Sequence, residues 1–527
     1  MNNKTYHLKE MSLKRNPHVD KLAKGIIILV ILALAGCHFP QPMPEDQVDP
    51  AQRMTEVAGI LNPVNPQTPT PQPLPTQGVT GVTPPPNPVQ LVDGFLFYTV
   101  QQGDTLPALA LRFGVEEAEI QAAAPLPDTG LLSIGSQIQL PDRLEGVLPY
   151  PESILPDSEV IYGPSVGSFD VTGYARAAGG FLAGYTELVR GEPMTGPEIV
   201  QKVAIETSTN PRLLLAFLEY RSGWVLEQPP NAENNRYPIG YNATGAAGLY
   251  HELMITARLL SQGFYGWRDG RQVEVSFKDG SRGRLSPGLN AGSTALMNLF
   301  AALHQRVVWE AQLYGEASFL NFYQAMFGDF WSRAATVEPY LLATDRQPEL
   351  ALPFTPGEAW SLTAGPHITW QTGTPRGALD FAPITGELPC AISYRWVTAS
   401  APGLVVRTNR GVVVLDLDGD GDEGTGWVLV YLHIAEKDRV PVGIWLEKDT
   451  PIGHPSCEGG QSTGTHVHLA RKFNGEWLST DEPFPMILSG WRAYAGRARY
   501  EGYLQKGDAI VTSRPDGSSG STIIRED

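Results

Sequence analysis

The sequence predicts a multidomain α+β protein: a small βααβ module, a mostly helical middle domain and an antiparallel β-sheet domain at the C-terminus. Apolar residues recur with the 3.6-residue period of helices across residues 155–350. From Leu352 onward, short β-branched segments bounded by Gly, Pro or Asp take over, which is typical of strands. A chain of 527 residues is long enough for three or four such domains.

The composition describes ordinary globular material with an acidic balance. Hydrophobic residues make up 42% of the chain and charged residues 18%, and the net charge is −17. Phosphate binding needs clustered Lys and Arg, so this balance argues against nucleic acid as a partner.

The N-terminus has the pattern of an export signal. Basic residues precede an apolar run over residues 25–35, among them Lys14, Arg15, Lys21 and Lys24. A run of about 11 apolar residues is short for a membrane span. It ends in Leu34-Ala-Gly-Cys37, which resembles a bacterial lipobox. The resemblance implies a signal peptide over 1–36 and lipidation of Cys37, which would tether an exported protein to the membrane. A transmembrane anchor and a conventional signal peptide are the alternatives.

Residues 37–92 have the composition of a linker. Fourteen prolines fall between residues 38 and 92, together with Gln and Thr. Such a segment cannot bury a core and is expected to be an extended, semi-rigid spacer.

Residues 93–143 form the small module. We expect a strand at 97–100, a helix over 106–113 closed by Gly114, a second helix over 116–124 and a strand over 134–141. The motifs Y-T-V-x-x-G-D-T-L, from Tyr98, and I-G-x-x-I-x-L-P, from Ile134, resemble a LysM domain. That resemblance implies binding of N-acetylglucosamine polymers such as peptidoglycan. A βααβ fold with another partner is the alternative.

The middle domain, residues 155–350, has no role that the sequence defines. Helices are expected over 196–207, 211–220, 254–261, 290–310 and 319–327, with a strand and turn at 273–280. The stretch 205–223 faintly resembles lysozyme-like lytic transglycosylases. Arg221 stands where that family has its catalytic glutamate, and arginine cannot act as the acid that a glycosidase needs. We therefore expect a helical scaffold here, and a degenerate glycan-binding fold and a second active site are the alternatives.

The C-terminal β domain is expected over 355–510, followed by a disordered tail over 511–527. Its strands are predicted at 397–401, 403–408, 411–417, 426–433 and 465–471. His466 and His468 lie two residues apart on the last of these strands, so their side chains share one face.

Five polar residues in this domain suit a catalytic metal site: His367, Asp380, His433, His466 and His468. Catalytic zinc typically takes three protein ligands and keeps a fourth position for water. Further groups are needed to move protons and to stabilise the oxyanion. Two histidines and a carboxylate as ligands, with two more histidines beside them, would fill these roles.

The same region resembles the lysostaphin/LytM-type zinc endopeptidases, and within them the β-lytic, LasA-like branch. The residues that carry the resemblance are Gly365-Pro-His367, Ala378-Leu-Asp380-Phe381 and Cys457-Glu-Gly-Gly-Gln-Ser-Thr-Gly-Thr-His466-Val-His468. The more common form of the first motif, H-x-G-x-D, would put its histidine at Arg376. The LasA-like form places the histidine earlier, at His367.

The resemblance implies zinc ligands His367, Asp380 and His468, with His433 and His466 as the catalytic histidines. It also implies a disulfide between Cys390 and Cys457, for which two buried free thiols are the alternative.

The stretch Asp416-Leu-Asp418-Gly-Asp420-Gly-Asp422 resembles the start of a calcium loop, with carboxylates at alternate positions. The late glutamate of an EF-hand is missing, because Trp427 stands in its place. A polar hairpin loop is the simpler interpretation.

Together these features predict a lipid-anchored envelope protein that faces the cell wall and cleaves peptide bonds in peptidoglycan with a zinc-bound water. Its glycan partner would bind the LysM module and the peptide would bind at the zinc site. The alternative is a non-catalytic wall-binding or regulatory scaffold with a degenerate peptidase domain. The position of His367 relative to Asp380 and His468 decides between them.

Overall fold

The computed structural model describes residues 84–228, 231–243 and 245–526. Cys37, the expected signal peptide and most of the expected linker lie outside these residues. Within them, no helix combines the length and the apolar character that crossing a membrane requires.

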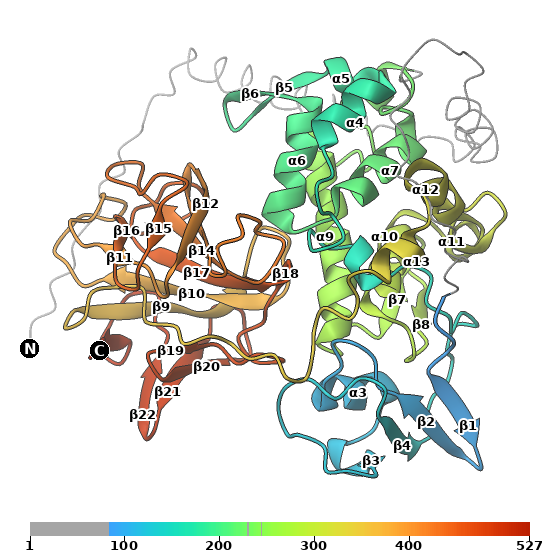
Figure 1. The fold of residues 1–527 in the computed structure, drawn as a ribbon, viewed down its shortest axis with the longest axis horizontal. Helices are drawn as coiled ribbons and strands as arrows, with labels where there is room; N and C mark the ends of the chain where they lie inside the picture. The colour runs from blue at the N-terminus through green and yellow to red at the C-terminus, as the bar shows by residue number, and fades with distance from the viewer. Residues whose placement is uncertain (1–83, 229–230, 244, 527) are drawn as a thin grey trace, which may run out of the picture. The chain divides into compact units, whose positions relative to one another are not determined.

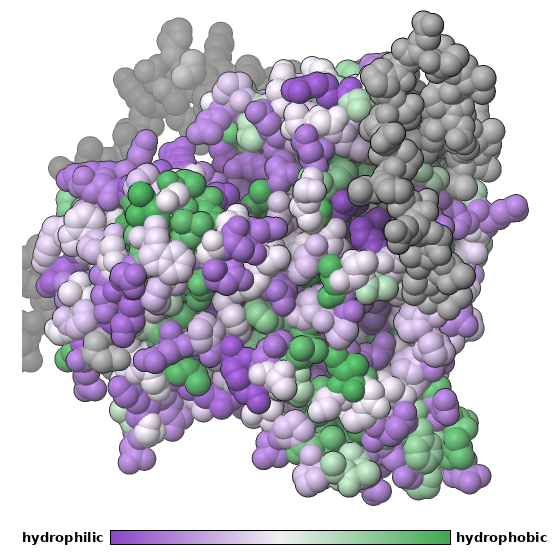
Figure 2. Space-filling view, viewed as in Figure 1, coloured by the Kyte–Doolittle hydropathy of each residue, from purple (hydrophilic) through white to green (hydrophobic). Residues whose placement is uncertain are grey.

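The N-terminal module is a small antiparallel sheet with one helix (Figure 1). Its strands follow the order β1-β2-β4-β3. The elements are β1 (Val89–Val92), β2 (Phe95–Thr99), α3 (Leu106–Phe113), the 3₁₀ turn η1 (Glu117–Glu119), β3 (Gln121–Ala122) and β4 (Gln137–Pro141). Thr105 caps the start of α3 by accepting a hydrogen bond from the Ala108 N–H, and Gly114 ends the helix at φ 67°. Apolar side chains lie exposed at the outer end of the β1–β2 hairpin, among them Leu91, Val92 and Phe95 (Figure 2).

The second helix expected over 116–124 is not found. Only one 3₁₀ turn forms, and the chain then enters β3, where Gln121 pairs with Gln139. A short helix gains too little to offset its nucleation cost, whereas strand pairing buries Ile120 in the module's core. Pro125 also disfavours a helical conformation at the residue before it.

The middle domain is helical, as predicted, with two short hairpins. Its elements are η2 (Asp157–Glu159), α4 (Val171–Ala178), α5 (Phe181–Gly184), β5 (Thr186–Val189), β6 (Glu192–Thr195), α6 (Gly196–Thr207), α7 (Pro211–Ser222), α8 (Ala232–Arg236), α9 (Leu249–Arg268), β7 (Glu274–Ser276), β8 (Arg282–Arg284), α10 (Ala291–Leu303), α11 (Arg306–Tyr314), α12 (Phe319–Phe327) and α13 (Phe330–Ala334). A capping box between Thr195 and Glu198 starts α6, and Asn210 followed by Pro211 starts α7. Helices α6 and α10 both pack on α9 (Figure 1).

The single helix expected over 290–310 is instead two helices, α10 and α11. The chain is extended at His304, whose carbonyl accepts a hydrogen bond from the Lys278 N–H after β7. A contact with a distant segment therefore overrides the continuous helical periodicity of this stretch.

Glu219, the carboxylate nearest to the lysozyme-like position, has a structural role. Its side chain is buried and accepts hydrogen bonds from the N–H groups of Val225 and Leu226, at 2.7 and 2.9 Å. The Arg221 guanidinium donates to the Ile239 carbonyl. These contacts agree with the expected helical scaffold.

The C-terminal domain is built on a nine-stranded antiparallel sheet in the order β15-β12-β13-β14-β17-β10-β9-β23, with β18 paired to β17. The strands are β9 (Ala359–Ile368), β10 (Arg376–Pro383), β11 (Val397–Thr398), β12 (Gly403–Asn409), β13 (Gly411–Asp416), β14 (Trp427–Ile434), β15 (Trp445–Leu446), β16 (Pro451–Gly453), β17 (Val467–Phe473), β18 (Glu476–Trp477), β19 (Ile487–Leu488), β20 (Trp491–Ala495), β21 (Gly502–Lys506), β22 (Ala509–Thr512) and β23 (Thr522–Ile524). Strands β19 to β22 form a separate four-stranded sheet.

Both faces of the large sheet are buried, in two different cores. On β17, Val467 and Leu469 belong to the core of the β domain, whereas Ala470 packs into the core that includes the middle domain. The same alternation on β10 places Leu379 and Phe381 in the β-domain core. Asp380 and His468 therefore lie on the opposite face.

The tail expected to be disordered over 511–527 is ordered through residue 526. β22 ends at Thr512, and β23 pairs with the edge strand β9. Ile523 is buried, and the buried Arg525 donates hydrogen bonds to the carbonyls of Leu352 and Phe354. These long-range contacts stabilise a segment that lacks a local apolar pattern.

A buried ionic cluster joins β12, β17 and the loop before β14. The Glu423 carboxylate binds Arg407 at 2.6 Å and Lys472 at 3.3 Å, and Lys472 also donates to the Ile205 carbonyl of α6. Burial opposes ionisation of Glu423, but the two cations outweigh it and lower its pKa from 4.5 to about 2.

Because of this cluster, we expect the folded state to lose stability as the pH falls into the acid range. A carboxyl group whose pKa is depressed by folding contributes stability above its unfolded pKa, and this contribution is lost as the pH falls toward 2. The depression of Glu423 corresponds to about 3 kcal/mol. Between pH 5 and pH 2.5 the wild type should lose more thermal stability than Glu423→Gln, measured by differential scanning fluorimetry. The exposed Glu447→Gln should behave as wild type, and equal acid sensitivity of all three would contradict the assignment.

Candidate metal centre

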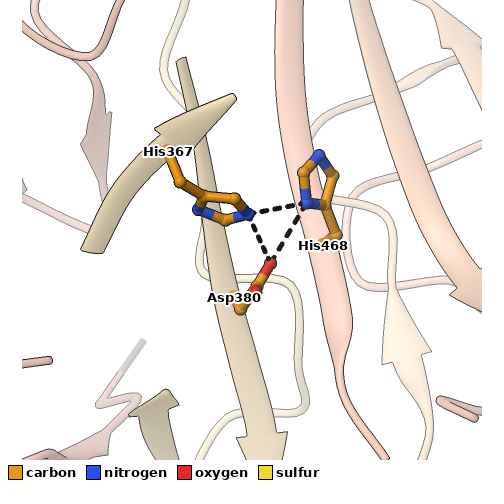
Figure 3. A group of neighbouring side chains, drawn as sticks. All are labelled: His367, Asp380 and His468. Atoms are coloured by element: carbon orange, nitrogen blue, oxygen red, sulfur yellow. Dashed lines mark hydrogen bonds and ion pairs between the residues drawn. The ribbon is translucent and has the colours of Figure 1, made fainter. Parts of the chain in front are cut away.

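Three strands bring His367, Asp380 and His468 together on one face of the sheet. They come from β9, β10 and β17, and Asp380 and His468 are direct cross-strand partners. Figure 3 shows the three side chains converging. The Nε2 atom of His367 lies 3.0 Å from Nδ1 of His468 and 3.2 Å from Oδ1 of Asp380, and the third side of the triangle is 3.1 Å.

Backbone carbonyls set the tautomers of both histidines. His367 Nδ1 lies 2.9 Å from the Gly365 carbonyl, and His468 Nε2 lies 3.1 Å from the Thr369 carbonyl. A carbonyl only accepts, so these two nitrogens carry the hydrogens in the neutral rings. The two remaining nitrogens and the Asp380 carboxylate then face one another as three acceptors.

Three buried acceptors at one point repel one another unless a cation lies between them. His367, Asp380 and His468 are 3%, 9% and 6% exposed, so water screens them little. Ligands of a tetrahedral zinc with bonds of about 2.0–2.1 Å lie about 3.3 Å apart, close to the observed triangle. The donor set, its spacing and its protonation thus fit a metal ion.

The pKa shifts of these side chains in the absence of a metal also indicate that a positive charge is favoured at this position. Burial opposes a charge on His367, but the Asp380 carboxylate outweighs it and raises the pKa of this imidazole. Burial likewise opposes ionisation of Asp380, yet His367 and His466 hold its pKa well below the usual value. A proton is thus favoured at the position that suits a metal cation.

His433 and His466 lie beside the triad, with ring centres 4.4 Å apart. His433 Nδ1 lies 2.9 Å from the Glu458 carbonyl, and His466 Nδ1 lies 2.8 Å from that of Gly464. His466 Nε2 is 3.5 Å from Oδ2 of Asp380. Burial, reinforced by His466 and His468, lowers the pKa of His433 to about 3, so its imidazole is neutral at pH 7.

A bulge aims His433 at this cluster. Gly411 pairs with Ile434 and Val412 pairs with Leu432, which leaves His433 as an extra residue in β14. Its φ is 69°, a left-handed conformation that is uncommon for residues other than glycine. Strained backbone of this kind is often found at functional sites, where the surrounding structure maintains it.

Cys390 and Cys457 form a disulfide, as the resemblance implied, and so are not free thiols. Cys457 directly precedes Glu458, whose carbonyl binds His433. The bridge thus ties the loop that orients His433 to the segment that follows β10.

Arg376 lies outside the cluster. Its guanidinium donates to the Gly496 carbonyl at 3.2 Å. His454, to which the sequence assigns only a structural role, binds the Arg395 carbonyl through Nδ1 and packs against Trp396.

Tyr500 is a neighbour of the site that sequence reasoning missed. Its ring centre lies 4.9 Å from that of His367, and its carbonyl accepts a hydrogen bond from the Gly365 N–H. It belongs to the connection between β20 and β21, far along the chain, where no local pattern marks it.

The acidic loop between β13 and β14 brings carboxylate oxygens of Asp416, Asp418 and Asp420 within 4.8 Å of one another. Asp422 instead accepts a hydrogen bond from the Gly424 N–H. Calcium binding at this loop stays a prediction.

A buried His–Asp–His triad flanked by two histidines on an antiparallel sheet resembles the site of lysostaphin/LytM-type metallopeptidases, and comparisons with known proteins find relatives among the LasA and β-lytic peptidases. The family model "LysM domain" matches residues 98–141, and "LasA, N-terminal domain" matches residues 153–339. The chain is thus a relative of the LasA and β-lytic peptidases, with a LysM domain preceding its LasA-like part.

The relatives cover different shares of the chain. Protease LasA of Pseudomonas aeruginosa is 26% identical over 369 residues, which cover 64% of this chain and 78% of that protein. Beta-lytic metalloendopeptidases of Achromobacter lyticus and Lysobacter enzymogenes are 29% and 28% identical over 160 residues, 29% of this chain and 40% and 83% of theirs. The solved structure of the M23 metalloprotease pseudoalterin, from the deep sea, is 23% identical; the match covers 32% of this chain and 96% of that one, with a TM-score of 0.27.

Proposed function

We propose that this protein is a zinc endopeptidase of the cell envelope that hydrolyses peptide bonds in peptidoglycan. The convergence of three buried acceptors, His367, Asp380 and His468, carries the proposal, because this arrangement suits a metal cation. Its relatives are named as a protease and as metalloendopeptidases.

The scaffold alternative would place Arg376 beside Asp380 and His367 far away. The observed contacts are the reverse: His367 lies 3.2 Å from Asp380, and Arg376 binds the Gly496 carbonyl. The geometry therefore favours an enzyme.

His367, Asp380 and His468 would hold the zinc ion, which would supply Lewis acidity and lower the pKa of a bound water. His433 and His466 each carry a hydrogen on Nδ1, bound to a backbone carbonyl, which leaves Nε2 as a proton acceptor. One of them would take the proton of the attacking water and later deliver it to the leaving amine. The other would orient the water or stabilise the oxyanion.

The LysM domain would hold the enzyme on the glycan strands of its substrate. Confining enzyme and polymer in this way raises their effective concentration, so that even weak glycan binding favours cleavage. Lipidation at Cys37, together with the proline-rich linker, would tether the protein to the membrane and extend the catalytic domain toward the wall.

Cleavage of purified peptidoglycan tests the proposal. The zinc-loaded protein should lower the turbidity of a peptidoglycan suspension and release new amino groups rather than new reducing ends. His466→Ala should slow this release by about 10²–10⁴-fold, because it removes a proton-transfer group, while zinc content stays near that of wild type. In cells, Cys37→Ser should move the protein from the membrane fraction to the soluble fraction. A zinc-loaded wild type that releases no amino groups would refute the enzyme assignment.

A further inference from the structure

The segment between β10 and β11, residues 384–395, exposes an unusual amount of apolar surface. Leu388 is 79% exposed, Tyr394 61%, Ile384 48% and Ile392 43%. We call these four side chains the apolar loop surface. Clusters of exposed apolar residues in soluble proteins often mark binding sites, whereas scattered single ones need no explanation.

The loop is rigidly held from within. The Glu387 carboxylate accepts hydrogen bonds from the hydroxyls of Thr385 and Ser393, at 2.9 and 2.6 Å, and from the Tyr394 N–H at 3.0 Å. Ser393 is buried, whereas Ile392 and Tyr394, on either side of it, are exposed. Apolar side chains on a preorganised loop bind a ligand without a large entropy cost.

The loop is also continuous with the candidate metal centre. Its Cys390 is bonded to Cys457, and the Ala391 carbonyl accepts a hydrogen bond from the Thr465 hydroxyl at 2.7 Å. Thr465 is the residue directly before His466. Ile392 therefore directly follows a residue whose carbonyl binds the neighbour of His466.

The charged groups of the loop are already paired. Glu387 is occupied by the three hydrogen bonds just described. Arg395 binds Glu358 at 2.6 Å, and its guanidinium lies 5.3 Å from the centre of the Tyr394 ring. The loop thus offers apolar and aromatic contacts and little free charge, which matches an uncharged, apolar peptide side chain.

From these contacts we infer that the apolar loop surface is a specificity site of the peptidase, which binds an apolar side chain of the substrate beside the scissile bond. This inference rests on the proposed function and deepens it, because it names the substrate class. The hydrogen bond between Thr465 and Ala391 places this loop next to the residue that precedes His466, so a peptide bound at the metal centre is the expected occupant.

The test is cleavage of a peptide pool by the full-length, zinc-loaded protein. The pool holds quenched pentapeptides whose central residue is Ala, Val, Leu, Phe, Ser, Asp or Lys, with products identified by mass spectrometry. Wild type should favour the apolar members by about 10-fold in kcat/KM, mainly through KM, which is the usual contribution of a hydrophobic pocket. The variants Ile392→Ser and Tyr394→Ser should reduce this preference to less than about 3-fold with unchanged zinc content.

Ile510→Ser is the matched control, because Ile510 is a similarly exposed apolar residue of β22. It should keep the wild-type preference. A wild type that cleaves all members equally, or a preference that survives both loop substitutions, would overturn the inference while leaving the peptidase assignment intact. Absence of any cleavage of the pool and of peptidoglycan would instead overturn the proposed function and, with it, this inference.

Discussion

His468→Ala should lose its bound metal and, with it, peptidoglycan hydrolysis. The substitution removes one of the three acceptors whose mutual repulsion the cation relieves, and the remaining pair, His367 and Asp380, can neutralise itself with a proton. Loss of a residue that merely supports a metal ligand costs 10–100-fold in affinity or activity, so loss of a ligand should cost at least about 100-fold. Zinc content by atomic emission and amino-group release from peptidoglycan measure the two effects.

A chelator experiment sharpens this expectation. Wild type treated with chelator and then dialysed should regain zinc and activity when zinc is added, whereas His468→Ala and His367→Ala should regain neither. Arg376→Ala is the control, because its guanidinium contacts the Gly496 carbonyl rather than the triad. Loss of zinc in Arg376→Ala with retention in His367→Ala would show that the ligand set is wrong.

Removal of the disulfide should have the second largest effect, on stability. The bond joins Cys390 and Cys457, which are 67 residues apart. Closing a loop of this length lowers the entropy of the unfolded chain, and the corresponding stabilisation is about 4 kcal/mol. Cys390→Ser/Cys457→Ser should therefore unfold at a markedly lower urea concentration, followed by tryptophan fluorescence. Because multidomain chains rarely unfold in two states, the midpoint of the β-domain transition is the quantity to compare.

Reduction of the wild type offers an independent check. Treatment with dithiothreitol should shift the wild-type transition toward that of the double variant and leave the variant itself unchanged. Cys37→Ser should unfold as wild type does, since this cysteine takes no part in the bond. An unchanged transition after confirmed reduction would contradict a stabilising role for the bridge.

Local patterns predict part of the regular structure, and they miss β9 and β10, which carry His367 and Asp380. The helix over 196–207 is predicted to the residue, because a capping box and a proline start it and its apolar residues have helical spacing. The strands that carry His433 and His468 are likewise predicted, since β-branched residues bounded by turn residues define them. The predictions are wrong where contact with a distant segment determines the local structure. β3 forms within the helix expected over 116–124, the helix expected over 290–310 is divided at His304, and β23 forms in the expected disordered tail.

The candidate site likewise has features that the sequence predicts and features that need the tertiary structure. The order and spacing of His367, Asp380, His433, His466 and His468 along the chain are enough to indicate a metal centre. A strand's two-residue period predicts that His466 and His468 share a face. In the structure β17 begins at Val467, and both histidines lie near Asp380. In the sequence, resemblance alone indicates which histidine replaces the one absent at Arg376. The contact between His367 and Asp380 supports the prediction that it is His367.

The sequence by itself determined the order of the domains, the class of structure in each and the chemical groups available, because these depend on composition and on neighbours along the chain. Only the tertiary structure decided that β9, β10 and β17 meet so that three acceptors converge, that a bulge turns His433 toward them and that Tyr500 packs on His367. These arrangements depend on strand register and on the packing of both sheet faces, which bring together residues that have no local pattern in common.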